Sequence, residues 1–90
     1  ISNVSIDMSS RNLLKMKTSK LREYVGDFPT EMLEHFFISF VNTLSFTCHI
    51  DTRGTNSHHI VEATFKSFTR ALSGALIHNN KNIASTKGML

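Results

Sequence analysis

Three histidines and one glutamate are spaced so that they can hold metal ions. His58 and Glu62 lie four residues apart in a segment with helical periodicity, so both side chains project from one face of a helix. The side chain of His59 points about 100° away around the same axis. Adjacent imidazoles that diverge in this way serve two ions more easily than one. We therefore predict one ion held by His58 and Glu62, and another held by His59 with His35 from an earlier helix.

Two protein ligands per ion make an incomplete site. A closed zinc site takes four protein ligands, and a manganese site has about six donors in all. The missing donors must come from substrate, water or another polypeptide surface. Mixed imidazole and carboxylate ligation suits manganese, iron or zinc, so the ligand types do not choose the metal. The alternative is a pair of exposed histidines at a helix start, with Glu62 balancing their charge.

Two well-known metal patterns do not fit this chain. The metalloprotease pattern His-Glu-x-x-His is absent, and its inverted form requires a histidine where the chain has Ala63. A di-iron bundle uses Glu-x-x-His on paired helices, whereas Glu31 and His35 are four residues apart. Both classes of metal protein are excluded.

Basic and hydroxyl side chains supply candidate contacts to an anionic substrate. Lys66 and Arg70 continue the four-residue spacing from Glu62, and Lys66 is placed to neutralise an anionic ligand. Arg11 lies in a predicted turn, where a guanidinium can grip phosphate through two hydrogen bonds. Ser85-Thr86-Lys87-Gly88 offers two hydroxyls and an ammonium. In the alternative interpretation these are solvated surface residues and a frayed terminus.

The first half of the chain contains the elements that must position these groups. Alternating polarity predicts a strand at residues 4–9 and a returning strand at 13–17, with a turn at 10–12 between them. Residues 18–28 are polar and mixed, with a turn at Gly26-Asp27. A helix is expected from Pro29-Thr30, capped by Thr30, with a buried stripe made of Leu33, Phe37, Phe40, Val41 and Leu44.

The second half continues with a strand and a longer helix. Residues 46–51 alternate again, and residues 53–55 form the turn that follows. Asn56 or Ser57 is expected to cap a helix running to about Leu76, with a buried stripe made of Val61, Phe65, Phe68, Leu72 and Ala75. Residues 79–84 are expected to form a loop. The order strand, strand, helix, strand, helix predicts an α+β fold, a small sheet with two helices on one face. We expect another sheet layer on the uncovered face.

Length and composition restrict the class of protein. Ninety residues make one domain, 1–90. The single cysteine, Cys48, is expected in a core strand and indicates a reducing compartment, and His49 and His78 are expected to be structural or exposed. No apolar run is long enough to cross a membrane, and no signal peptide is visible, which favours the cytoplasm. The net charge of +3 suits a small phosphorylated substrate as well as it suits nucleic acid, and it requires neither. Aromatic residues are not interleaved with a basic cluster, which argues against nucleic acid.

Three segments of the chain, in the same order as in the family, resemble imidazoleglycerol-phosphate dehydratase. The run from Gly54 to Lys66, followed by Arg70-Ala71-Leu72, is similar to the family's second histidine-pair signature. Residues 30–37 and 85–88 resemble two further family segments. The resemblance implies that the chain is the second half of a duplicated two-layer subunit whose first half is absent. It also implies homo-oligomers, octahedral in the family, with manganese sites at subunit interfaces.

The resemblance also implies a reaction and a set of roles. Family members are lyases that dehydrate imidazole glycerol phosphate to imidazole acetol phosphate in histidine biosynthesis. Two Mn²⁺ ions bind the imidazole ring and stabilise its anionic form, so that the hydroxyl leaves through a diazafulvene-like intermediate. The implied metal ligands are His35, His58, His59 and Glu62, and the implied substrate contacts are Arg11, Lys66, Ser85, Thr86 and Lys87. No residue is assigned as the general base.

The chain departs from the family pattern in two places. The family's turn commonly reads Ser-Gly-Arg-Pro, whereas this chain has Ser9-Ser10-Arg11-Asn12, which changes what aims Arg11. The missing first half leads us to expect no normal turnover from the chain, unless a complementary half is present or the chain self-assembles to mimic one. A non-catalytic half-domain that binds metal and oligomerises is the alternative, and a basic domain that binds phosphate or nucleic acid is a third hypothesis.

Overall fold

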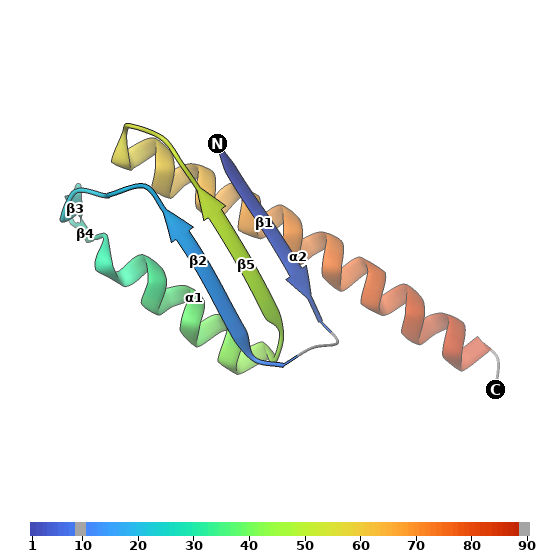
Figure 1. Ribbon diagram of the computed structural model, residues 1–90. Coiled ribbons are helices and arrows are strands. Elements are labelled where there is room, and N and C mark those ends of the chain that lie inside the picture. The colour runs from blue at the N-terminus through green and yellow to red at the C-terminus, as the bar shows by residue number, and fades with distance from the viewer. Residues whose placement is uncertain (9–10, 89–90) are drawn as a thin grey trace.

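The sheet and helices of the chain form the expected α+β arrangement (Figure 1). The computed structural model describes residues 1–8 and 11–88, with side chains as far as His78. Its elements, in chain order, are β1 (Ser2–Asp7), β2 (Leu13–Thr18), β3 (Tyr24–Val25), β4 (Phe28–Pro29), α1 (Glu31–Leu44), β5 (Thr47–Thr52) and α2 (Ser57–Gly88). The small strands β3 and β4, which the sequence did not predict, pair across the predicted turn at Gly26-Asp27, where Gly26 has φ +59°.

The three-stranded sheet is mixed, with β5 in its centre. β1 pairs with β5 in antiparallel register and β2 pairs with β5 in parallel register, so Val4 and Met16 both lie opposite Ile50. The strand at residues 13–17 therefore returns antiparallel to the first strand, but β5 separates the two. A parallel pair needs a crossover connection, and α1 supplies it between β2 and β5.

Both helices cover one face of the sheet, as predicted. Residues at even positions of the strands point toward the helices, among them Ile6, Leu14 and Cys48, and pack into one core. The centre of that core is aromatic, because the rings of Phe37 on α1 and Phe68 on α2 lie 4.8 Å apart. α1 lies over β2 and α2 lies over β1 and β5 (Figure 1).

The opposite face of the sheet is polar. Its exposed side chains include Asn3, Ser5, Lys15, Lys17 and Asp51, which line a shallow concavity. The core between two packed sheets is built from apolar side chains of their inner faces. The polar character of this face does not favour the expected second sheet layer, which stays a prediction.

The predicted role of Thr30 as a side-chain cap of α1 is wrong. Its backbone is already helical, and its hydroxyl donates to the carbonyl oxygens of Arg22 and Glu23, so no side-chain cap bond forms. Thr30 instead ties the preceding loop to the helix start. At the other end, Ser45 adopts a left-handed conformation at φ 56° and its amide donates to the Val41 carbonyl, a common way to end a helix.

The predicted end of the second helix near Leu76 and the predicted loop at 79–84 are also wrong. α2 is helical as far as Gly88 and extends well beyond the sheet (Figure 1). No proline or glycine stands between Leu76 and Gly88, and asparagine costs a helix only a few tenths of a kcal/mol, so nothing local ends it. Over the part of the chain that is described, neither helix combines the length and apolarity needed to cross a membrane.

Candidate metal centre

The first turn of α2 is held firmly from both sides. The amide of His59 donates to the Asn56 side-chain oxygen at 3.0 Å, so Asn56 is the cap, one of the two residues predicted. Ser57 is buried and accepts a hydrogen bond from the Arg22 amide at 3.0 Å. One turn later the buried hydroxyls of Thr64 and Thr52 share a 3.0 Å hydrogen bond that joins α2 to β5. The backbone that carries the histidine pair is therefore fixed.

His58 and Glu62 are placed to share one ion. Nδ1 of His58 lies 3.8 Å from Oε2 of Glu62, and both side chains are about half exposed, at 63% and 47%. Donors roughly 2.1 Å from a common metal lie roughly 3–4 Å from each other. An imidazole nitrogen and a carboxylate oxygen at this spacing fit a divalent cation without rearrangement of the helix. Open solvent beside them leaves room for further ligands.

His59 diverges from His58, as the helical spacing predicts. The two ring centroids are 5.9 Å apart and the ring planes are inclined by 70°. His35 lies on α1, where it lines a groove with Phe36 and Ser39. Among the described residues, no group of three histidine, cysteine, aspartate or glutamate side chains converges on one point. The pairing of His59 with His35 thus remains a prediction that depends on a larger assembly.

Lys66 contacts the candidate metal site directly. Its Nζ lies 2.7 Å from Oε1 of Glu62, on the opposite side of the carboxylate from His58. This hydrogen bond, reinforced by the charge of Lys66, lowers the pKa of Glu62, and the charges of His58 and His59 add to the effect. Glu62 is therefore kept ionised, which is the form that binds metal.

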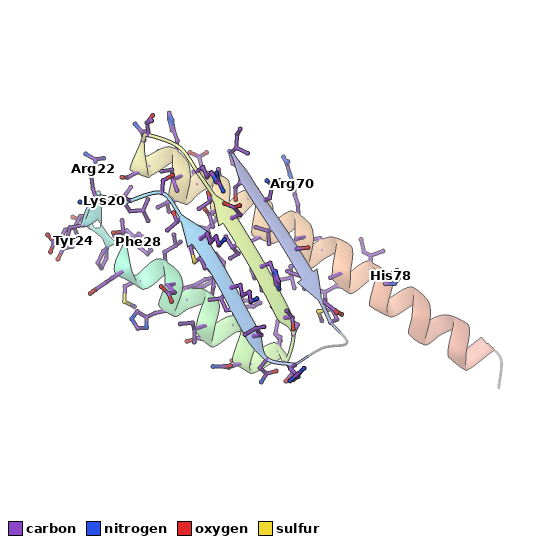
Figure 2. All side chains as sticks on the ribbon, in the orientation of Figure 1. Lys20, Arg22, Tyr24, Phe28, Arg70 and His78 are labelled. Atoms are coloured by element: carbon purple, nitrogen blue, oxygen red, sulfur yellow. The ribbon has the colours of Figure 1, made fainter. Side chains whose placement is uncertain are left out.

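Replacing Lys66 with methionine tests this contact. The pKa of Glu62 should rise toward its ordinary value, because the largest cause of its depression is removed. A carboxylate-detected NMR titration of Glu62 measures the change. Arg70→Met is the matched control, since Arg70 lies one turn further along α2 (Figure 2) and the substitution removes the same positive charge. An equal rise of the pKa in both variants would show that the long-range field, and not the contact, sets it.

Apart from Lys66, the predicted substrate contacts do not gather around this centre within one chain. Arg11 lies just before β2, where its carbonyl accepts a hydrogen bond from the Thr47 hydroxyl, which fixes the turn without glycine or proline. Thr47 begins β5 and α2 follows the end of β5, so Arg11 and His58 lie at opposite ends of the strand, roughly 20 Å apart. Residues 85–87 are roughly 40 Å from His58 along α2, and their side chains lie outside the described residues.

Two basic residues near the histidine pair were not predicted from the sequence. Lys20 and Arg22 lie beside the start of α2 (Figure 2), where they line a shallow pocket with Thr55, Asn56 and Ser57. The sequence signal that could have identified them is the presence of two basic side chains close together in the segment 18–28. The position of these two residues beside α2 follows from the hydrogen bond between the Arg22 amide and the Ser57 hydroxyl. The local sequence pattern does not reveal this contact.

The remaining titratable residues fit the interpretation made from the sequence. Cys48 is buried in β5, and burial raises its pKa to about 11, so it is a neutral core thiol. His49 is exposed on the polar face of the sheet. His78 is exposed on the part of α2 that extends past the sheet (Figure 2).

The described chain is a small mixed α+β layer with two adjacent histidines at the start of its second helix, and sequence comparison identifies the family. Residues 1–72 match the imidazoleglycerol-phosphate dehydratase family. The chain belongs to this family.

Individual relatives agree with this assignment. The imidazoleglycerol-phosphate dehydratase of Staphylococcus saprophyticus is 44% identical over 92 residues, which cover 100% of this chain and 48% of that protein. The histidine biosynthesis bifunctional protein HisB of Legionella pneumophila is 42% identical over 90 residues, 26% of its length. The crystal structure of the Staphylococcus aureus dehydratase superposes with a TM-score of 0.74 at 46% identity, covering 79% of this chain and 42% of that one. The chain thus spans between about a quarter and about half of the length of these relatives.

Proposed function

We propose that this chain supplies one half of a dehydratase subunit that converts imidazole glycerol phosphate to imidazole acetol phosphate in histidine biosynthesis. The observation that carries the proposal is the 3.8 Å spacing of His58 and Glu62 on a capped helix, inside the segment that matches the family. The proposed location is the cytoplasm.

The metal residues divide between two Mn²⁺ ions. His58 and Glu62 bind one ion, and His59 and His35 each contribute to the second, with the remaining donors supplied from other polypeptide surfaces. Other divalent ions fit the same donors. The bound metals supply Lewis-acid stabilisation of the negative charge that develops on the substrate's imidazole ring. Lys66 keeps Glu62 ionised before the metal arrives, and in this proposal it also contacts the substrate.

The distance between the two groups of residues supports a site shared between chains. Arg11 and the segment Ser85-Thr86-Lys87 bind the substrate phosphate in this proposal, yet they lie far from His58 in one chain. A substrate of this size reaches both groups only where the ends of different chains meet. This requirement favours a homo-oligomer, and the family resemblance implies a large octahedral particle for the complete subunit.

A second candidate function is a non-catalytic half-domain that binds metal and oligomerises. The observation in its favour is that the chain spans only 48% of the Staphylococcus saprophyticus dehydratase, and no three-ligand cluster forms among its described residues. Catalysis distinguishes the two candidates, because only the first one dehydrates the substrate.

The test is complementation with the other half of that relative. The purified chain is assayed for imidazole acetol phosphate formation in Mn²⁺, alone and after mixing with the part of the Staphylococcus saprophyticus dehydratase that this chain does not match. We expect no turnover alone and turnover in the mixture, abolished when the chain carries His58→Ala. Turnover by the chain alone, at the rate of the complete relative, would contradict the proposal that the chain supplies only one half of a subunit. An inactive mixture, when the two matching halves of the relative itself reconstitute activity, would favour the non-catalytic function.

A further inference from the structure

The segment between β2 and β3, residues 19–23, lies beside the starts of both helices (Figure 1). Its first residue is tied to the connection between β5 and α2. The Ser19 amide donates to the Thr52 carbonyl at 3.1 Å, and the Ser19 hydroxyl accepts from the Gly54 amide at 3.2 Å. Leu21 packs against the core from a half-buried position. The segment is therefore an anchored part of the fold and can hold other elements in place.

The backbone of Arg22, within this segment, joins the two helix starts. Its amide donates to the Ser57 hydroxyl at 3.0 Å, and Ser57 is the first residue of α2 and only 6% exposed. Its carbonyl accepts a hydrogen bond from the hydroxyl of Thr30, which directly precedes α1. We call these two hydrogen bonds the Arg22 bridge. One residue thus connects α1 to α2 through its main chain, without using its side chain.

The candidate metal ligands lie close in sequence to both ends of the Arg22 bridge. The histidine pair follows Ser57 directly, and His35 lies five residues after Thr30. The aromatic contacts that join α1 to α2 lie further along α2, because they involve Phe65 and Phe68, at least two turns beyond the histidine pair. The bridge is therefore placed to set the position of the first turn of α2 relative to α1.

We propose that the Arg22 bridge sets the orientation of the histidine pair relative to α1, and that Ser57 and Thr30 are positioning residues that do not touch the metal. The inference rests on the proposed function, in which ligands on both helices of one chain meet donors from other polypeptide surfaces. Metal–ligand distances tolerate changes of only about 0.2 Å, so a small displacement of either helix start takes a ligand out of reach. Two hydrogen bonds to one backbone residue restrict that displacement.

Substitutions that remove one hydroxyl at a time test the Arg22 bridge. Ser57→Ala and Thr30→Val should each weaken Mn²⁺ binding by the full chain about three- to tenfold, the effect of losing one hydrogen bond. The double variant should bind no more than about twofold more weakly than the weaker-binding single variant, because a bridge broken at one end no longer transmits position. The free Mn²⁺ signal in electron paramagnetic resonance gives each affinity. Losses that multiply in the double variant, or a native affinity in the Thr30 variant, overturn the proposal.

Two matched controls remove a hydroxyl from the same helices, away from the bridge. Ser67→Ala deletes the hydroxyl on α2 that donates to the Ser2 carbonyl at 3.1 Å. Thr43→Val deletes the hydroxyl near the end of α1 that donates to the Ser39 carbonyl at 2.8 Å. Both variants should keep the native Mn²⁺ affinity. An equal loss in the controls would show that general destabilisation lowers the affinity, and it would overturn the positioning role.

Amide hydrogen exchange of the metal-free chain, followed by NMR, tests the coupling of the two helix starts without any metal. Thr30→Val should speed exchange of the His59 amide at the start of α2, and Ser57→Ala that of the Leu33 amide in the first turn of α1. Each change should exceed that of the Ile50 amide in β5, which reports global unfolding. Exchange that changes only on the substituted helix overturns the proposal. If the native chain bound no Mn²⁺, the proposed metal site would fail, and exchange alone would decide the role of the bridge.

Discussion

Replacing His58 with alanine should weaken Mn²⁺ binding by at least about 10- to 100-fold. Loss of groups that merely orient a metal ligand already costs this much, and this variant lacks one of the two proposed donors to the ion. Glu62→Gln should have a similar effect, because it removes the anionic oxygen that lies 3.8 Å from the His58 nitrogen. The loss of the free Mn²⁺ signal in electron paramagnetic resonance, titrated with protein, gives the affinity of each variant.

His49→Ala is the matched control for this experiment. It removes an exposed imidazole from the open sheet face, away from the start of α2, and should leave Mn²⁺ affinity unchanged. His59→Ala should lower the number of ions bound while the ion at His58 and Glu62 remains. A native-like affinity in the His58 variant would contradict the candidate site, and an equal loss in the His49 variant would point to non-specific imidazole binding.

The features predicted correctly from the sequence are those set by local spacing. Asn56 caps α2 because a short acceptor side chain stands three residues before a free amide. Phe37 and Phe68 are buried because each lies in a stripe at helical spacing. His58 and Glu62 meet because four residues make one helical turn. In each case the physical cause lies within one turn of the chain, so the sequence is sufficient.

The features that were missed depend on partners far away in the sequence. The hydroxyl of Thr30 binds loop carbonyls seven and eight residues earlier, which no capping pattern anticipates. The central place of β5 is set by pairing with β1 and β2 together, since alternation identifies strands but not their neighbours. The surroundings of Lys20 and Arg22 likewise arise from a contact with Ser57, 35 residues away from Arg22.

The candidate site was predictable only in part for the same reason. Helical spacing fixes the relation of His58, His59 and Glu62, and the structure retains it. In the proposed function, the relation of His35 to His59 depends on how chains assemble, and that of Arg11 to either depends on which chain ends meet. Such relations would be properties of an assembly, so they are tested by complementation and not by the fold of one chain.

Replacing Phe37 with alanine should destabilise the fold by about 3–5 kcal/mol, the usual cost of deleting a large buried ring. Phe37 has no exposed surface, and its ring lies 4.8 Å from Phe68 and 5.5 Å from Phe65, so its removal breaks the contact between α1 and α2. Domains of this size are stable by only about 5–15 kcal/mol. Urea unfolding, followed by circular dichroism, should show a large fall in the midpoint.

The control for this variant lies one residue along the same helix. Ile38 is exposed, so Ile38→Ala changes helix propensity without emptying the core, and its stability should stay within about 0.5 kcal/mol of the native chain. All samples must have one protein concentration, because any association adds stability by mass action. If Phe37→Ala lost less than about 1 kcal/mol, the ring cluster would not be what joins the two helices.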